Sequence, residues 1–98
     1  MKPSQTLREA IKLIRKHGWH QGNYVGPGGC LCAAAAIHEA TGYEDTANVA
    51  AKREILELVY GPGNHRSIPT WNDHPSQTRY NVLRTMGRAA RKLEKEGR

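Results

Sequence analysis

Residues 18–36 read GWHQGNYVGPGGCLCAAAA, and this stretch decides how the rest of the chain can fold. It holds two aromatic residues, both cysteines, a histidine, a glutamine and five glycines, and it ends in four alanines. Glycines at this density favour a structured loop, whereas a run of alanines is typical of a helix. We predict a helix that begins at Cys30 or Cys32 and extends through Ala40, with Gly42 ending it. Because alanines let neighbours approach closely, this helix should be the central, most buried one.

The segment before Gly18 predicts an amphipathic helix that is opened by Pro3 and Ser4 or by Thr6. Thr6 and Glu9 have the spacing of a capping box, in which both side chains accept hydrogen bonds from amides at the helix start. Its apolar residues fall on one face at helical spacing. They are Leu7, Ala10, Ile11 and Ile14. Gly18 has the position of a C-terminal glycine, so we expect the helix to end there.

Two more helices are predicted downstream, one over about residues 47–60 and one running to about Glu96. The expected N-caps are Asp45 or Thr46 for the former and Ser76 or Thr78 for the latter. The expected inner faces are Ala47, Ala51, Ile55, Leu58 and Val59, and Val82, Met86, Ala89, Ala90 and Leu93. Lys52, Arg53, Glu54 and Glu57 should form the solvated side of the former helix.

A second loop, over residues 65–78, is predicted to pack against the first. Large apolar groups favour burial, so both tryptophans, Tyr24 and Val25 should be buried. Asn72 or Asp73 can accept amide hydrogen bonds from the start of the last helix. The residues expected to hold the two loops together are Trp19, Gln21, Tyr24, Trp71, Asn72 and Asp73. An extended piece at residues 66–68 leaves room for a minor β-hairpin between residues near Tyr24 and Ile68.

Length and composition place these elements in one domain, residues 1–98. The chain is 38% hydrophobic and has no phenylalanine, which favours a small all-α domain of about four helices over a β-sandwich. No run approaches the ~20 apolar residues that cross a membrane, and the N-terminus lacks a signal-peptide pattern. The two cysteines are one residue apart, a spacing that favours free thiols. These features predict a cytoplasmic protein.

The formal net charge of +6 is unevenly distributed. Residues 1–20 carry +4, residues 21–75 carry −3 and residues 76–98 carry +5. The cations of the two terminal helices that could bind a partner are Arg84, Arg88, Arg91, Lys95, Lys12, Arg15 and Lys16. Such stripes suit nucleic acid or an acidic protein surface, although the solvated face of an ordinary amphipathic helix has the same pattern.

Catalysis and metal binding are weaker alternatives. Cys32 at a helix start, with His20 and Asp73, could form a cysteine-dependent hydrolase or transferase, because a helix N-terminus can lower a thiol pKa. A buried structural cysteine is the simpler interpretation. Cys30, Cys32, His20 and His38 could together supply four zinc ligands, but the two cysteines are spaced too closely for a typical zinc site. Residues 26–29 could suggest a phosphate-binding loop, but they lack the Gly-Lys-Ser/Thr ending of a P-loop. We predict no metal and no cofactor.

The motif Gly18-Trp19-x-Gln21-Gly22-x-Tyr24, a cysteine before an alanine-rich helix, and Trp71-Asn72-Asp73-x-Pro75 together resemble a family of small proteins of unknown function. That family occurs in actinobacteria and their bacteriophages, and the resemblance covers about residues 7–93. It implies a phage-encoded or bacterial product and no catalytic residues; Cys30 departs from its pattern. The leading hypothesis is a non-enzymatic binding module that engages a host macromolecule. A self-associating assembly component is a further alternative.

Overall fold

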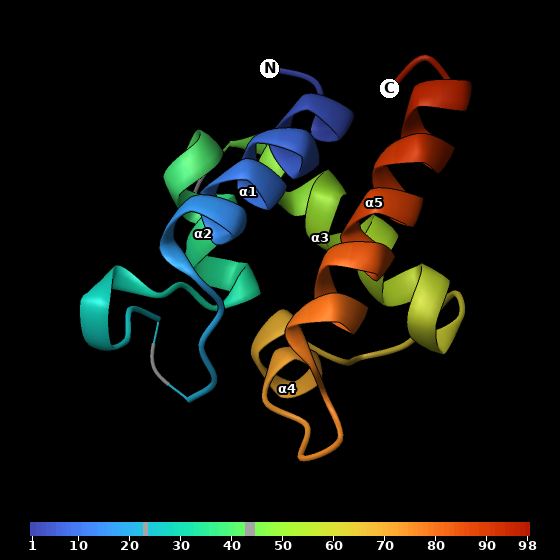
Figure 1. The fold of residues 1–98 in the computed structure, drawn as a ribbon. Helices are drawn as coiled ribbons and strands as arrows, with labels where there is room; N and C mark the ends of the chain where they lie inside the picture. Colours follow the sequence, from blue (N-terminus) through green and yellow to red (C-terminus); the bar gives the residue numbers. More distant parts are fainter. Residues whose placement is uncertain (23, 43–44) are drawn as a thin grey trace.

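The computed structural model describes residues 1–22, 24–42 and 45–98, and its helices are shown in Figure 1. The elements in order are α1 (Pro3–His17), the 3-10 turn η1 (Pro27–Gly29), α2 (Ala33–Thr41), α3 (Thr46–Tyr60), α4 (Ile68–Asn72) and α5 (Arg79–Lys95). Helices α1 and α5 pack against each other in antiparallel orientation. The termini therefore lie close together, and the Ser4 amide donates to the Arg98 carbonyl at 3.4 Å. The all-α prediction is confirmed.

Helix α2 supplies the alanine-lined centre of the core. Its residues 33–37 are buried against α1, α3 and α4. The helix begins after Cys32 and ends at Gly42, as predicted. The predicted inner face of α5 is also confirmed, because all five of its apolar residues are buried. Gly18, Gly42 and Gly61 follow α1, α2 and α3, and each has a positive φ that other residues rarely adopt.

The helix starts of α3 and α5 match the prediction, and α1 takes the earlier of its two expected starts. The Asp45 carboxylate accepts from the Ala47 amide at 2.7 Å, and the Thr78 hydroxyl caps α5. Helix α1 begins at Pro3, one of the two starts that the sequence left open, and the fixed φ of proline suits the first helical position. Thr6 consequently lies inside the helix and is fully buried, with its hydroxyl donating to the Lys2 carbonyl. The capping box predicted at Thr6 was wrong.

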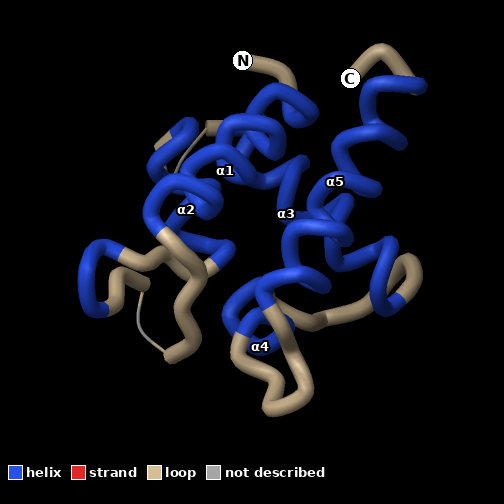
Figure 2. The backbone as a smooth tube through the Cα atoms, in the orientation of Figure 1, coloured by secondary structure: helices blue, strands red, loops and turns tan. Residues whose placement is uncertain are grey.

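The second loop contains a short helix that the sequence analysis missed. Ser67 caps α4 through a hydrogen bond from the Thr70 amide, and Pro69 lies in the first turn. The expected extended piece ends at Ser67, because Ile68 begins this helix, and the possible hairpin with residues near Tyr24 is not among the described pairings. Figure 2 draws no strand in the described chain; its only β-type pairs there are single bridges from residue 31 to residues 19 and 25.

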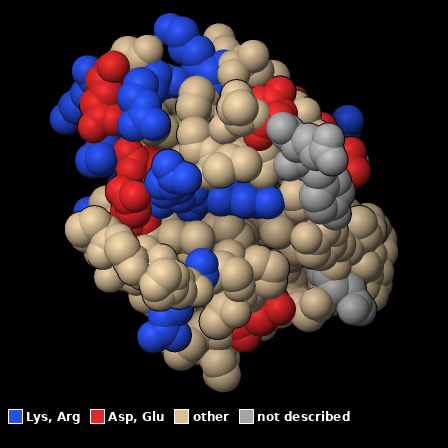
Figure 3. Space-filling view, turned by 180° about the vertical axis from the view of Figure 1, so that it is seen from behind, with Lys and Arg blue, Asp and Glu red and all other residues tan. Residues whose placement is uncertain are grey.

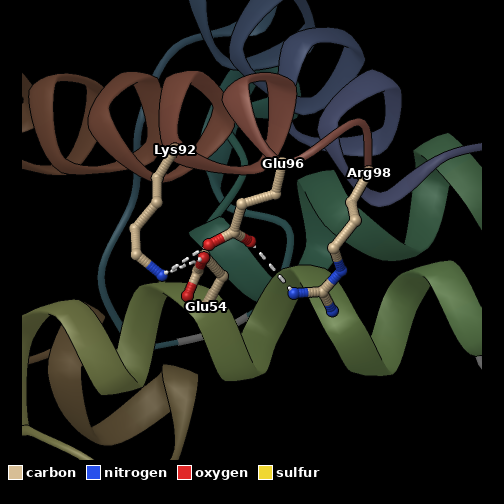
Figure 4. A network of polar contacts seen from close by, with 4 residues as sticks. All are labelled: Glu54, Lys92, Glu96 and Arg98. Carbon is tan, nitrogen blue, oxygen red and sulfur yellow. Dashed lines mark hydrogen bonds and ion pairs between the residues drawn. The ribbon is translucent and has the colours of Figure 1, made fainter.

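Burial differs most from the prediction at four described positions, while Trp19 and Leu58, also expected to be buried, are partly buried. Tyr24, Val25 and Val59 were expected in the core but are 42%, 56% and 41% exposed. Glu54 was expected on the solvated side of α3, yet it is buried beneath α5. Its carboxylate binds Lys92 Nζ at 2.9 Å, and Lys92 also contacts Glu96 (Figure 4). This small ion network joins α3 to the C-terminal end of α5.

Candidate functional site

Asn72, at the end of α4, joins the two tryptophan loops. Its side-chain oxygen accepts from the Trp19 indole at 2.7 Å and from the Ala33 amide at 3.0 Å. Its side-chain nitrogen donates to the His20 carbonyl at 3.0 Å. Asn72 is fully buried, so these bonds satisfy groups that water cannot reach. The Ala33 amide is one of the unpaired donors at the start of α2, which means that a residue from another loop helps to cap this helix.

Gln21 and Asp73 extend this contact toward the surface. The Gln21 amide nitrogen donates to the carbonyls of Asn72 and His74, at 3.1 and 3.0 Å. One carboxylate oxygen of Asp73 accepts from the Gly22 amide and from Asn72 Nδ2. Asn72 and Asp73 therefore bind the first loop instead of the start of α5, where the sequence analysis placed their bonds. Trp71 is 3% exposed and fills the core beneath.

The thiol of Cys32 lies in surroundings that favour its neutral form. Cys32 is 4% exposed, and burial raises its pKa, with the nearby Asp73 carboxylate adding to the effect. Hydrogen bonds from amides at the start of α2 oppose that rise without cancelling it. A nucleophilic cysteine requires the opposite shift, because the thiolate is the reactive species. Asp73, which would have to orient a base, is occupied by Gly22 and Asn72.

His20 packs against the backbone of the 26–29 turn. A Cβ atom added at Gly26 would lie 2.4 Å from His20 Nδ1, so only glycine fits beside this ring. Its Nε2 atom is buried and has no hydrogen-bond partner. Among the described residues, no three His, Cys, Asp or Glu side chains are grouped so that they could hold a metal ion.

A polar cluster around His38 was not foreseen as such. Asn48 Nδ2, fully buried, lies 3.0 Å from His38 Nδ1 and 2.9 Å from the Gly42 carbonyl. Lys52 Nζ and the Tyr24 hydroxyl lie 3.5 and 3.4 Å from His38 Nε2. Burial, together with the charge of Lys52, lowers the pKa of His38. The signal in the sequence was that His38 and Asn48 lie on two helices that are close in sequence, but this proximity alone does not place their side chains together.

A groove of about 860 Å³ lies on the surface between α1 and α5. Its cationic lining residues are Arg8, Lys12 and Arg15 from α1 and Arg79, Arg84, Arg88 and Arg91 from α5. The remaining lining residues are Ile11, Tyr80, Leu83 and Gly87, so no acidic residue belongs to the described lining. Five of the seven cations proposed from the sequence lie here. Lys16 and Lys95 lie outside, and Arg8 and Arg79 were missed although they share the same helices.

Most of the groove cations have no charged partner in the described chain. Arg8 is the exception, because it forms two hydrogen bonds with Glu94 at 2.8 and 3.0 Å at one end of the groove. No ion pair of the described residues involves any of the other six. Like charges three or four residues apart on a helix cost a few tenths of a kcal/mol per pair. The groove is therefore an arrangement that folding alone does not favour.

The face in Figure 3 shows a different arrangement of charge. There, Lys and Arg atoms lie directly beside Asp and Glu atoms over much of the upper left of the view. The ion network of Glu54, Lys92, Glu96 and Arg98 has this mixed character (Figure 4). Mixed charge of this kind is ordinary for a soluble surface, whereas the groove concentrates one sign.

A family of unknown function, DUF6197, has a model that matches residues 1–92 of the chain. The chain belongs to this family. Comparison with curated proteins and with solved structures gives no match. In the described residues of this DUF6197 protein, no helix is both long enough and apolar enough to cross a bilayer. Family membership assigns no activity, so any function has to be argued from the groove and the loops.

Proposed function

We propose that this DUF6197 protein is a non-enzymatic module that binds nucleic acid in the groove between α1 and α5. One observation carries the proposal: seven cations from two helices line one recess, with no acidic residue in its described lining. Phosphate neutralisation by such a set gives an affinity that depends strongly on salt and little on sequence. Binding would also offset the repulsion among the unpaired cations. The proposal places the protein in the cytoplasm of a bacterial host, as the product of a phage or of the bacterium.

Nucleic acid suits the groove better than an acidic protein surface does. Six of the seven cations are arginines, whose planar guanidinium group binds phosphate through two parallel hydrogen bonds. The cations also continue along both walls, from Arg79 to Arg91 on α5. That span corresponds to about 18 Å of helix. A regular run of phosphates matches such a line of charge, whereas carboxylates on a folded protein are scattered.

The test is fluorescence anisotropy of a labelled oligonucleotide, titrated with protein between about 50 and 200 mM salt. The variant carries Arg84→Glu, Arg88→Glu and Arg91→Glu. We expect its affinity to fall at least about 100-fold, and the slope of log affinity against log salt to become shallower by roughly two. Circular dichroism should show an intact fold, because these side chains are exposed and unpaired.

A matched control carries the same charge change outside the groove, as Lys16→Glu, Arg53→Glu and Lys95→Glu. Equal losses in the two triple variants would mean that net charge, and no particular site, attracts the oligonucleotide, which would contradict the proposal. Poly-glutamate that competes as well as nucleic acid would instead favour an acidic protein partner. Self-association is a separate prediction, which light scattering of the unliganded protein tests.

A further inference from the structure

Gly87 lies in the middle of α5 and on the floor of the groove. Glycine inside a helix is unfavourable relative to alanine, because it loses more backbone freedom on folding. The fold does not require it here: its φ is not positive, and a Cβ atom added at this position would meet nothing within 4 Å. The missing side chain therefore leaves open space between the cationic walls that protein atoms do not use.

The shape of this space suits one strand of nucleic acid. Helices that read a duplex protrude into its major groove, whereas these cations line the walls of a recess between two packed helices. The ~18 Å of cationic helix can contact several consecutive phosphates of one strand. A strand in the recess can place its backbone close to the bare helix at Gly87 and reach cations on both sides.

Tyr80 gives the groove an exposed aromatic ring. It is 75% exposed, the highest value among the large hydrophobic residues of the described chain, and it lies in the first turn of α5 beside Arg79. An aromatic ring left in water contributes little to the fold, but it offers a face on which an unpaired base can stack. Paired bases in a duplex do not present such a face without unstacking.

We infer that the occupant of the groove is single-stranded nucleic acid, with its phosphates over Gly87 and a base stacked on Tyr80. This inference rests on the proposed function and narrows its ligand from nucleic acid in general to one unpaired strand. It also assigns roles to two uncharged residues. Electrostatic binding without sequence preference would give no role to Gly87 or to Tyr80.

The experiment measures anisotropy with labelled thymidine and uridine single strands and with a duplex of the same length. We expect both single strands, or one of them, to bind the unmodified protein at least tenfold more tightly than the duplex. Gly87→Leu should fill the recess and weaken single-strand binding at least tenfold. Tyr80→Ala should weaken it about five- to tenfold, whereas Tyr80→Phe, which keeps the ring, should bind like the unmodified protein.

Thermal unfolding keeps the Gly87 result interpretable. Gly87→Ala should raise Tm by about 4 °C, because it removes a helix-interior glycine where there is room for the methyl group. Gly87→Leu should leave Tm unchanged or raised, so that any loss of binding reflects the filled recess. Equal affinity for duplex and single strands, with Gly87→Leu and Tyr80→Ala binding normally, overturns the inference and leaves the cationic site standing. Failure of every oligonucleotide to bind at low salt overturns the proposed function as well.

Discussion

The loop junction and the groove differ in whether their polar groups have partners within the protein. At the junction, Asn72 uses both side-chain atoms to join Trp19, His20 and Ala33, and water is excluded. In the groove, six cations stand exposed and form no ion pair with the described residues. A saturated buried network specifies one fold, whereas unpaired charges do not help the fold and remain available to a ligand. The contrast separates the part of the molecule that provides stability from the part available for binding.

The comparison predicts that Asn72→Ala costs stability and leaves binding unchanged. The substitution strands the Trp19 indole and the Ala33 amide as donors, and the His20 carbonyl as an acceptor. Because each unsatisfied buried group costs about 1–3 kcal/mol, the free energy of unfolding should fall by about 3–5 kcal/mol. Urea denaturation measures this loss. Oligonucleotide affinity, corrected for the folded fraction, should match that of the unmodified protein.

Asn81→Ala is the matched control, since Asn81 is an exposed asparagine on α5 outside the groove lining. Its loss should change the free energy of unfolding by about 0.5 kcal/mol or less. Comparable losses in the free energy of unfolding would show that the junction contributes no more to stability than an exposed asparagine does. Weaker oligonucleotide binding by folded Asn72→Ala would break the separation between junction and groove.

The sequence was sufficient to predict most of the fold because its signals are local. Glycines at 18, 42 and 61, and caps at Asp45 and Thr78, mark helix ends through the backbone of a few adjacent residues. Helix α4 was missed because five residues are too short to show helical periodicity. Glu54 was predicted to be solvated because its partner, Lys92, is 38 residues away, and no local sequence pattern predicts an ion pair between residues so far apart.

The candidate site was less predictable, for the same physical reason. The cationic stripes of α1 and α5 can each be identified by helical spacing, but only packing brings the two stripes to one groove. In the sequence, Gly87 resembled an ordinary helix position. The role that we infer for it depends on the open space above it, which only the structure shows. The role of Asn72 in capping α2 joins residues 39 positions apart. The sequence motifs pointed to both loops without showing which atoms would meet.

The reactivity of the cysteine thiols gives a chemical test of burial next to the loop junction. Because burial raises the pKa of Cys32, we expect that thiol to resist iodoacetamide near pH 7.5 in the native protein. A Cys30→Ser variant isolates it, since Cys30 is the partly exposed thiol. Mass spectrometry should find slow labelling of native Cys32 and rapid labelling in urea. Fast native labelling would instead favour the cysteine-dependent enzyme that the sequence left as an alternative.

The smallest expected effect concerns the polar cluster around His38, which lies outside the groove and the Asn72 junction. Asn48 Nδ2 lies 3.0 Å from His38 Nδ1 and Lys52 Nζ lies 3.5 Å from His38 Nε2, so each ring nitrogen faces a donor and a doubly protonated ring is unfavourable. Burial, and then the charge of Lys52, lowers the pKa of His38 below its ordinary 6.5, so the unfolded chain binds the proton more tightly. Its contribution to stability is therefore complete above pH 6.5 and is lost as the pH falls from there through the lower pKa of the folded state.

Urea midpoints measured between about pH 7.5 and pH 5 should decrease with falling pH, and His38→Gln should make this decrease shallower. His65→Gln is the matched control, because His65 is exposed. An unchanged pH profile in His38→Gln would show that the cluster tolerates a charged imidazole. That result would imply that Asn48, whose side-chain oxygen has no partner, turns its amide to accept the new proton. The polar cluster would then adapt to charge, unlike the fixed network at Asn72.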